Sequence, residues 1–339
     1  MATRKTFSIS LPNSVAMLSA SILLIAVGAP GNAAAQADAR AYPERNVRII
    51  DAYSAGGGSD TLARLIAPKL AEMWGKQVII ENRPGASGAI GTDAAAKSPP
   101  DGHTLLMGID GSIAVNPSLF PNLPYNPERD LAPITQTAVQ PMILVVPLSV
   151  PVGTVKELLA LARAQPGKIN FSSGGPGGTS HLAAELFKAQ TKIDVGHVPY
   201  KGSAPAVLAV LGSEVQMMIS IAPPLLPHIN SGRLKALGVA SNARSHLLPA
   251  VPTVSEAGVP GYEASGWNGL FAPARTPAAI VQKINADVVK ALAMPDVRDR
   301  LASMGATLVG SSPEEFAAFV KQETARWGKV IRDNNIRAD

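Results

Sequence analysis

Two segments rich in serine and glycine hold the residue types best suited to binding chemistry. Residues 54–60 read Ser-Ala-Gly-Gly-Gly-Ser-Asp, and residues 172–180 read Ser-Ser-Gly-Gly-Pro-Gly-Gly-Thr-Ser. Each segment follows a short apolar run and precedes an amphipathic one, so each is expected to join a strand to a helix. The first turn of a helix presents unpaired N–H groups and a partial positive charge, and glycine lets a ligand approach them. The pattern predicts a site for an anion.

The pattern alone leaves two interpretations of this pair of segments open. Because the segments are about 120 residues apart and lie in different halves of the chain, they suggest two facing lobes that clamp an anionic group. The alternative is that both are ordinary strand-to-helix turns, in which serine and threonine only cap the helices.

Enzyme chemistry has little support in the sequence. Gly85 to Ala89 lacks the last glycine of a Gly-x-Ser-x-Gly nucleophile elbow, and the glycines at 56–58 lack the third glycine of a dinucleotide fingerprint. The five histidines show no metal-ligand spacing and are expected to be structural. Asp60 is better explained as a charge in the first turn of a helix than as the catalytic partner of Asp51. We expect no enzyme, no cofactor and no metal.

Composition limits the class of protein further. The chain has 339 residues, of which 46% are hydrophobic and 16% charged, with a net charge of +5 and no cysteine. This composition is typical of a folded protein, and the weak positive charge argues against a nucleic-acid partner. The lack of cysteine excludes disulfides, a cysteine nucleophile and a lipid-modified cysteine.

The first 37 residues have the pattern of an export signal. Arg4 and Lys5 precede an apolar run over about residues 15–27, and Ala35-Gln36-Ala37 forms a small-residue cleavage site. The run is too short for a membrane span, which needs about 20 apolar residues. We expect a signal peptide at residues 1–37 that is cleaved near Ala37, and a soluble mature protein in the periplasm. The Sec and twin-arginine routes both stay open.

The elements that must position the two segments alternate between strand and helix. The expected strands are 46–50, 78–82, 104–109, 142–146, 168–171, 195–198, 215–219 and 234–240. Helices are expected between most of them, and a proline-rich stretch at 117–133 separates two units. Capping signals predict helices that begin at 154, 277 and 313. This alternation predicts parallel sheets with right-handed crossovers.

A series of short motifs resembles the periplasmic solute receptors of tripartite tricarboxylate transporters, the Bug family, over essentially the whole mature chain. The motifs are Val-Arg-Ile-Ile at 47–50, Gly-Gly-Gly-Ser-Asp at 56–60, Glu-Asn-Arg-Pro-Gly-Ala at 81–86, Pro-Pro-Asp-Gly at 99–102, Asn-Pro-Ser-Leu at 116–119, His-Val-Pro-Tyr-Lys-Gly at 197–202 and Pro-Thr-Val-Ser-Glu-Ala-Gly at 252–258. Each motif is weak alone, but their order is highly specific.

The resemblance implies an α/β clamshell of two lobes, each a mainly parallel sheet flanked by helices. Residues 38–140 and 270–339 would form lobe 1, and residues 141–269 would form lobe 2. The cleft between them would enclose a small carboxylate, which a monomeric receptor delivers to membrane transporter subunits. The alternative is a sensor that presents the bound carboxylate to a membrane signalling kinase.

The resemblance also implies the residues that contact the ligand. Ser59 would donate its hydroxyl, Gly57 and Gly58 would donate backbone N–H groups, and Asp60 would orient the loop or a bound water. The second segment and Tyr200 would form the opposing wall. The expected ligand-binding residues are Tyr53, Ser54, Gly57, Gly58, Ser59, Asp60, Ser87, Ser173, Gly175, Gly177, Gly178, Thr179, Tyr200 and Ser220.

Two departures from the family pattern bear on the choice of ligand. Asp51-Ala52-Tyr53 stands where relatives often have Val-Pro-Phe, and Ile219-Ser220-Ile221 stands where they commonly carry an acidic residue and Asn. Loss of the acid removes a partner for an ammonium group, which argues against an amino acid. The apolar area of Tyr53, Ile219 and Ile221 favours a carboxylate with an apolar or aromatic body.

Overall fold

The computed structural model describes residues 41–337, so the expected signal peptide lies outside the described residues. The first half of the chain forms three parallel strands, β1 (Val47–Asp51), β2 (Val78–Asn82) and β3 (Thr104–Ile109), in the order β2-β1-β3. The helices α2 (Gly58–Trp74) and α3 (Ala89–Ala96) connect them. All five elements were predicted, because their apolar periodicities are local and strong.

The second half repeats this arrangement. The strands β5 (Ile169–Ser173), β6 (Val195–Pro199) and β7 (Met217–Ile221) are parallel, in the order β7-β5-β6. The helices α6 (Val155–Ala164), α7 (Thr179–Thr191), α8 (Ser203–Leu211) and α9 (Ala222–Asn230) accompany them. The predicted capping box at the start of α6 is confirmed, because Thr154 Oγ1 accepts the Glu157 N–H and the Glu157 carboxylate accepts the Thr154 N–H.

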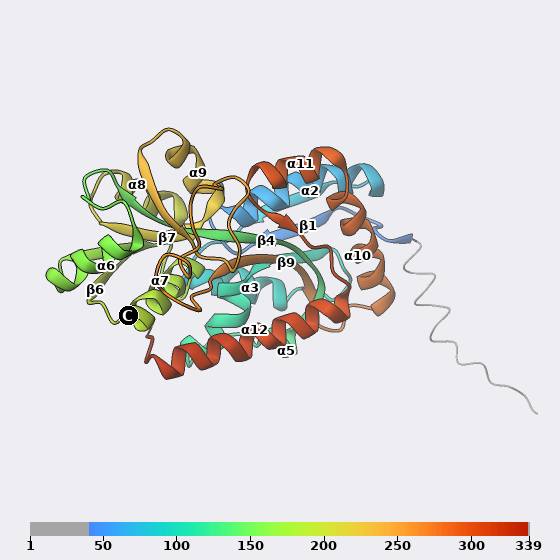
Figure 1. Ribbon diagram of the computed structural model, residues 1–339. Helices are drawn as coiled ribbons and strands as arrows, with labels where there is room; N and C mark the ends of the chain where they lie inside the picture. Colours follow the sequence, from blue (N-terminus) through green and yellow to red (C-terminus); the bar gives the residue numbers. More distant parts are fainter. Residues whose placement is uncertain (1–40, 338–339) are drawn as a thin grey trace, which may run out of the picture.

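A single long strand, β4 (Leu131–Pro147), joins the two halves (Figure 1). Its residues 131–141 pair with β9 (Ser265–Pro273), and its residues 142–147 pair with β7 and β8 (Leu234–Val239). The change of partner at Pro141 and Met142 lies close to the expected lobe boundary after residue 140, although the boundaries themselves stay a prediction. β9 also pairs with β3, so the whole of this strand belongs to the sheet of the first half.

The central strands correct the prediction of mainly parallel sheets. β4 is antiparallel to β7, β8, β9 and the short β10 (Thr307–Leu308), so only the outer three strands of each half are parallel. The first part of β4 was assigned to a proline-rich connection and β9 was not predicted. Pro133 fits in a strand because register shifts interrupt the pairing of β4 with β9 between Pro133 and Thr135 and again between Gln136 and Ala138.

Helices cover both faces of the sheet, and the last of them spans the molecule. α10 (Ala278–Leu292) and α11 (Pro295–Ser303) pack with α2 on the first half, and α12 (Pro313–Asp333) runs beneath β9 and β4 in Figure 1. The predicted start of α12 at residue 313 is confirmed, and its Phe316 and Trp327 are fully buried. The predicted threonine cap of α10 is wrong, because Pro277 is the N-cap and the Thr276 hydroxyl donates to the Pro273 carbonyl.

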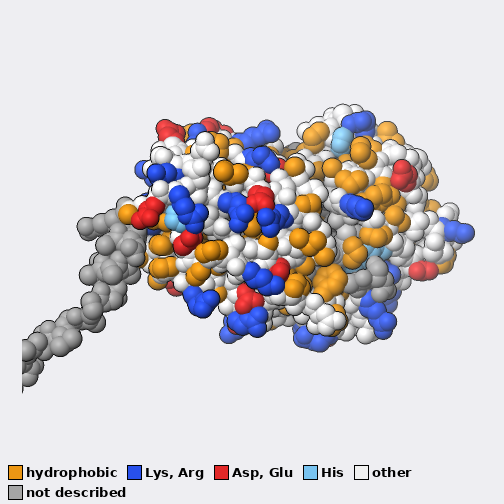
Figure 2. Space-filling view, turned by 180° about the vertical axis from the view of Figure 1, so that it is seen from behind, with side chains coloured by type: hydrophobic (Ala, Val, Ile, Leu, Met, Phe, Trp, Pro, Cys, Tyr) orange, Lys and Arg blue, Asp and Glu red, His pale blue; other side chains and the backbone are white. Residues whose placement is uncertain are grey.

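Short elements fill two further connections. The element η1 (Ala86–Gly88) lies between β2 and α3, and η2 (Gly111–Val115), α4 (Asn116–Leu119) and α5 (Pro127–Asp130) lie between β3 and β4. Basic and acidic side chains are interspersed over the face seen from behind in Figure 2, in keeping with the low net charge. Within residues 41–337, no helix is both long enough and apolar enough to cross a bilayer.

Candidate functional site

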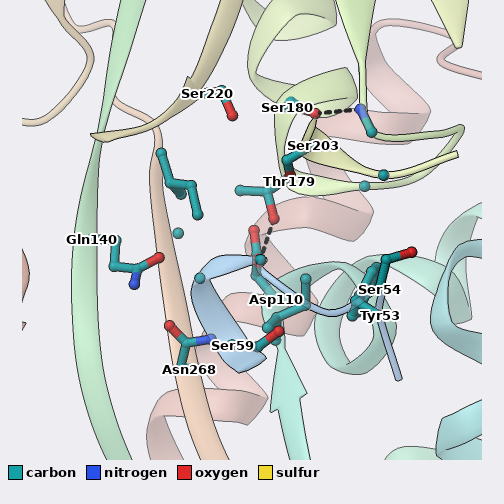
Figure 3. A pocket seen from close by; sticks show the side chains of 18 of the residues that line it. Tyr53, Ser54, Ser59, Asp110, Gln140, Thr179, Ser180, Ser203, Ser220 and Asn268 are labelled. Atoms are coloured by element: carbon teal, nitrogen blue, oxygen red, sulfur yellow. Dashed lines mark hydrogen bonds between the residues drawn. The ribbon is translucent and has the colours of Figure 1, made fainter. Parts of the chain in front are cut away.

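A cavity of about 100 Å³ lies where the two halves meet. Its wall is formed by the chain that follows β1, β3, β5 and β6, together with the end of β7, the middle of β4 and the start of β9. Ligands of α/β proteins bind outside the carboxyl ends of parallel strands, and here the strand ends of both halves face the same space (Figure 3).

Two aspartates hold the loop between β1 and α2 in shape. The Ser59 hydroxyl and the Tyr53 N–H each donate to Asp51 Oδ1 at 3.0 Å. Asp60 Oδ2 accepts the Gly56 N–H at 2.9 Å, and the Asp60 carboxylate pairs with Arg64. Burial raises the pKa of Asp60, but hydrogen bonds from Arg64, Gly56 and Asn82 outweigh it, so the pKa lies below its ordinary value. Asp60 therefore supports the loop and does not line the cavity.

The glycines of this loop bring its backbone close to the other half of the molecule. A Cβ on Gly58 would lie 2.7 Å from Ile221 Cδ1 on β7 and 2.8 Å from Gln140 Oε1 on β4. The Ser59 hydroxyl was predicted to donate to the ligand, but in the structure its single proton is directed to Asp51. A ligand in the cavity meets the Ser59 backbone and can use the hydroxyl oxygen only as an acceptor while this bond stands.

Three helices begin at the cavity without a side-chain cap. These are α2 after Gly57, α7 after Gly178 and α8 after Gly202. Their first N–H groups provide a positive potential and hydrogen-bond donors for an anion. Among the described residues that line this cavity there is no lysine, arginine or histidine. The positive potential at the site therefore comes from the backbone.

The second loop rests on a pair of stacked histidines. The rings of His181 and His197 lie 4.1 Å apart, and burial lowers their pKa values to about 3 and about 4. His181 Nδ1 accepts the Gly177 N–H, and His197 Nε2 bonds to the Ser173 hydroxyl. Both imidazoles are neutral at pH 7, so they shape the loop without adding charge, as expected for structural histidines.

Contacts between the two halves close over the cavity. Thr179 Oγ1 at the start of α7 donates to Asp110 Oδ1 after β3 at 2.6 Å (Figure 3). The Ser87 hydroxyl donates to the Pro176 carbonyl. Since Asp110 and Ser87 belong to the first half and Thr179 and Pro176 to the second, both bonds require the halves to approach each other.

Four buried polar atoms of the cavity wall lack a hydrogen-bond partner in the structure. They are Asp110 Oδ2, Gln140 Nε2, Trp267 Nε1 and Asn268 Oδ1, on side chains that are at most 2% exposed. Buried polar groups are nearly always paired, so these four atoms are candidates for hydrogen bonds with a polar ligand. Burial raises the pKa of Asp110 to about 7 against the opposite effects of the hydrogen bond from Thr179 and of the backbone N–H groups of Gly111 and Asp110.

These four residues were missed by sequence reasoning. Gln140, Trp267 and Asn268 lie on β4 and β9, in segments where no strand was predicted. Asp110 directly follows the predicted strand at 104–109. The rule that ligands bind at the carboxyl ends of parallel strands was a signal that could have identified it.

A second cavity of about 690 Å³ adjoins the first and shares Tyr53, Ser54, Gly174, Gly178 and Gly202 with it. The predicted site residues divide between the two. The first cavity is lined by Tyr53, Ser54, Gly57, Gly58, Ser59, Gly178, Thr179 and Ser220, and the second also by Ser87, Gly175 and Tyr200. Asp60, Ser173 and Gly177 line neither cavity and support the two loops. Contact of these residues with a ligand stays a prediction.

Two of the three apolar side chains that were expected to favour an apolar ligand line the cavity. Tyr53 and Ile221 line the first cavity, where Ile109 and Met142 add further apolar surface. Ile219 is fully buried in the core and does not reach the cavity. Tyr53 also donates its hydroxyl to the Ser87 carbonyl, which fixes its ring at the border between the two cavities.

Comparisons of the sequence and of the structure with known proteins point to the family that the motifs resemble. The family described as tripartite tricarboxylate transporter family receptor matches residues 62–336. Protein BugT of Bordetella pertussis is 37% identical over 319 residues, which cover 93% of this chain and 98% of BugT.

Two solved structures of similar proteins carry a dicarboxylate. Rpa4515 of R. palustris with adipate is 36% identical, with a TM-score of 0.84 over 87% of this chain and 99% of that one. MatC (Rpa3494) of Rhodopseudomonas palustris with bound malate is 34% identical, with a TM-score of 0.82 over 86% of this chain and 100% of that one. The chain therefore belongs to the family of tripartite tricarboxylate transporter receptors, as the order of its motifs indicated.

Proposed function

We propose that the protein is a periplasmic receptor that captures a small organic carboxylate between its two halves and delivers it to the membrane subunits of a tripartite transporter. The observation that carries this proposal is the meeting of three uncapped helix N-termini at one cavity that has no cationic lining residue. Such a site suits a carboxylate, whose charge the backbone N–H groups can share. Adipate and malate in the two similar structures support the same class of ligand.

The proposal assigns no catalysis to the site. No group of three or more His, Asp or Glu side chains in residues 41–337 could hold a metal ion. The Ser59 and Thr179 hydroxyls donate to the carboxyl groups of Asp51 and Asp110. The proposed role is capture and release, and the expected signal peptide at residues 1–37 would direct the chain to the periplasm.

The lining of the cavity narrows the ligand class. Tyr53, Ile109, Met142 and Ile221 give it apolar walls, while Gln140 and Trp267 offer unpaired donors. We therefore propose a carboxylate whose body is largely apolar, with a second polar group that reaches these donors. An amino acid fits less well, because the positive potential of the three helix N-termini would repel its ammonium group.

A thermal-shift panel tests the proposal. Adipate, L-malate, succinate, citrate, benzoate and L-glutamate would each be added to purified protein, and mass spectrometry of the natively purified protein would identify any retained ligand. We expect stabilisation by one or more of the carboxylates without an ammonium group. Stabilisation by glutamate alone would contradict the ligand class. Uptake of the bound compound by cells with and without the gene would test delivery to the transporter.

A further inference from the structure

Asp110 is a carboxyl group in the wall of a cavity that is built for an anion. The residue is 1% exposed and directly follows β3. Its Oδ1 accepts the Thr179 hydroxyl at 2.6 Å, and its Oδ2 has no partner in the structure. A carboxylate in this position would repel the ligand that the helix N-termini attract. The same cavity therefore holds one feature that favours an anion and one that opposes it.

Among the described residues, no cation acts on the Asp110 carboxyl to resolve this conflict. The charged group that acts on it is Glu323 on α12, whose negative charge raises the pKa of Asp110 and which is itself paired with Arg326. The Tyr53 hydroxyl, on the loop after β1, is the other titratable group that interacts with Asp110. Burial is the largest influence and raises the pKa of Asp110 to about 7. A second negative charge in the same cavity would raise it further.

We propose that Asp110 binds the ligand as a neutral carboxylic acid, donating a hydrogen bond from Oδ2 to an oxygen of the bound carboxylate, so that each ligand is captured together with one proton. The inference rests on the proposed function. The proposed hydrogen bond gives Asp110 Oδ2 a partner, and the proton removes the repulsion between the negative charges of Asp110 and the bound carboxylate. The proton comes from solvent and forms an O–H bond on the Asp110 carboxyl, and no bond within the ligand forms or breaks.

The choice of oxygen follows from the geometry. Oδ1 already accepts from Thr179, and a carboxylic acid carries a single proton, so Oδ2 is the oxygen left to donate. Gln140 Nε2 and Trp267 Nε1 are further unpaired donors in the same wall. The three donors together would surround an anionic oxygen as the helix N-termini do elsewhere in the cavity.

A measurement without added ligand tests the protonation of Asp110. The free energy of unfolding of the wild type and of Asp110→Asn would be measured between pH 4 and pH 8, with Asp110→Ser as a second neutral variant. A proton held by Asp110 in the folded state makes the wild type lose stability as pH rises from about 4 to about 7, relative to both variants. An identical pH dependence in all three proteins would overturn the proposal, because Asp110 would then be ionised throughout.

A second measurement tests the linked proton. Titration calorimetry with adipate and L-malate as probes, at pH 8 in buffers with different heats of ionisation, gives the number of protons taken up. We expect close to one proton per ligand in the wild type and none in Asp110→Asn. Affinity of the wild type should fall about tenfold per pH unit above pH 7, and affinity of Asp110→Asn should not.

Asp51 supplies the matched control, because it is also fully buried and burial raises its pKa to about 7. Asp51→Asn should retain the linked proton, whatever its affinity. Loss of the proton in Asp51→Asn alone would assign it to Asp51 and refute the proposal. Loss of binding in Asp110→Asn without proton uptake by the wild type would refute it too, because an ionised Asp110 would then accept a hydrogen bond from the ligand. If neither probe nor any member of the panel binds, the proposed function fails, and the first measurement still decides the state of Asp110.

Discussion

Thr179 and Asp110 connect the two halves of the protein by a hydrogen bond of 2.6 Å across the cavity. Thr179 is the first residue of α7, whereas Asp110 directly follows β3. The bond forms only when the helix N-terminus of the second half approaches the strand end of the first. It therefore ties the start of α7 to a buried acid in the wall of the ligand cavity, and it acts to lower the pKa of that acid against the larger effect of burial.

Thr179→Val tests the contribution of this bond to closure. Valine keeps the shape of threonine but removes the donor, and a hydrogen bond to a buried group contributes about 1 kcal/mol or somewhat more. We expect ligand affinity to fall by roughly tenfold, since 1.4 kcal/mol corresponds to a factor of ten. Titration calorimetry with the best ligand of the panel measures the change.

The matched control for Thr179→Val is Thr191→Val, on the same helix. The Thr191 hydroxyl donates to the Phe187 carbonyl within α7, at the end of the helix away from the cavity. This variant should leave ligand affinity within twofold of the wild type. An equal loss of affinity in both variants would show that α7 as a whole, and not the bond to Asp110, sets the affinity.

Gly58→Leu tests the close approach of the first loop to the other half. A side chain here would meet Ile221 and Gln140, which both lie on strands of the joined sheet beyond the loop. Since Gly58 does not need a left-handed backbone conformation, the clash is steric and not a matter of backbone strain, and its contact with Ile221 arises between the two halves. We expect at least a tenfold loss of affinity, with the melting temperature of the protein without ligand changed by no more than a few degrees.

Gly212→Ala is the control for Gly58→Leu. Gly212 caps the end of α8 on the surface, with a φ of −77° that any residue adopts. Affinity in this variant should match the wild type. A Gly58→Leu protein that binds as tightly as Gly212→Ala would exclude the loop from the binding site.

The two loops could be predicted from sequence because their signals are local. Glycines, a hydroxyl residue and a helical periodicity follow one another within about ten residues in each loop. The residues that complete the cavity depend on pairing between distant strands. Gln140 reaches it from β4 and Asn268 from β9, whose pairing spans more than a hundred residues of chain.

The sequence of β9 also lacks a clear strand pattern. Its Gly266 and Gly269 weaken the β pattern, yet the structure requires them, because a Cβ on Gly269 would lie 2.0 Å from the Phe316 ring. That ring belongs to α12, so the reason for the glycine lies outside the strand. Because a helix far away in the sequence requires this glycine, the local pattern of β9 does not reveal the strand.

Asp51→Asn should change the pH dependence of stability in a defined direction. Burial raises the pKa of Asp51 to about 7, above the value of an unfolded aspartate. The folded state therefore holds a proton that the unfolded state releases, and stability falls as pH rises from about 4 to about 7. Asparagine removes this titration, so the variant should lose less stability over that range. Chemical unfolding at half-unit pH steps measures the difference.

Asp60→Asn should change the pH dependence of stability in the direction opposite to Asp51→Asn. The pKa of Asp60 is lowered, so its contribution to stability is present at neutral pH and is lost as pH falls through the folded-state pKa. The wild type should therefore lose this contribution below about pH 4, and Asp60→Asn should lack it at pH 7. A common direction for both aspartates would contradict the assignment of Asp51 as the buried, protonated member.

Ser59→Ala distinguishes support of the loop from direct contact with the ligand. The Ser59 hydroxyl donates to Asp51 Oδ1, and this bond lowers the pKa of that carboxyl against the larger effect of burial. Without it, Asp51 should titrate at a higher pH, and the protein should lose about 1 kcal/mol of stability at pH 8 and less at pH 5, where Asp51 is neutral. Ligand affinity should fall at both pH values if the hydroxyl oxygen also accepts from the ligand or a bound water. A loss of affinity confined to pH 8 would instead show that Ser59 acts only through Asp51, and unfolding and calorimetry at the two pH values separate these outcomes.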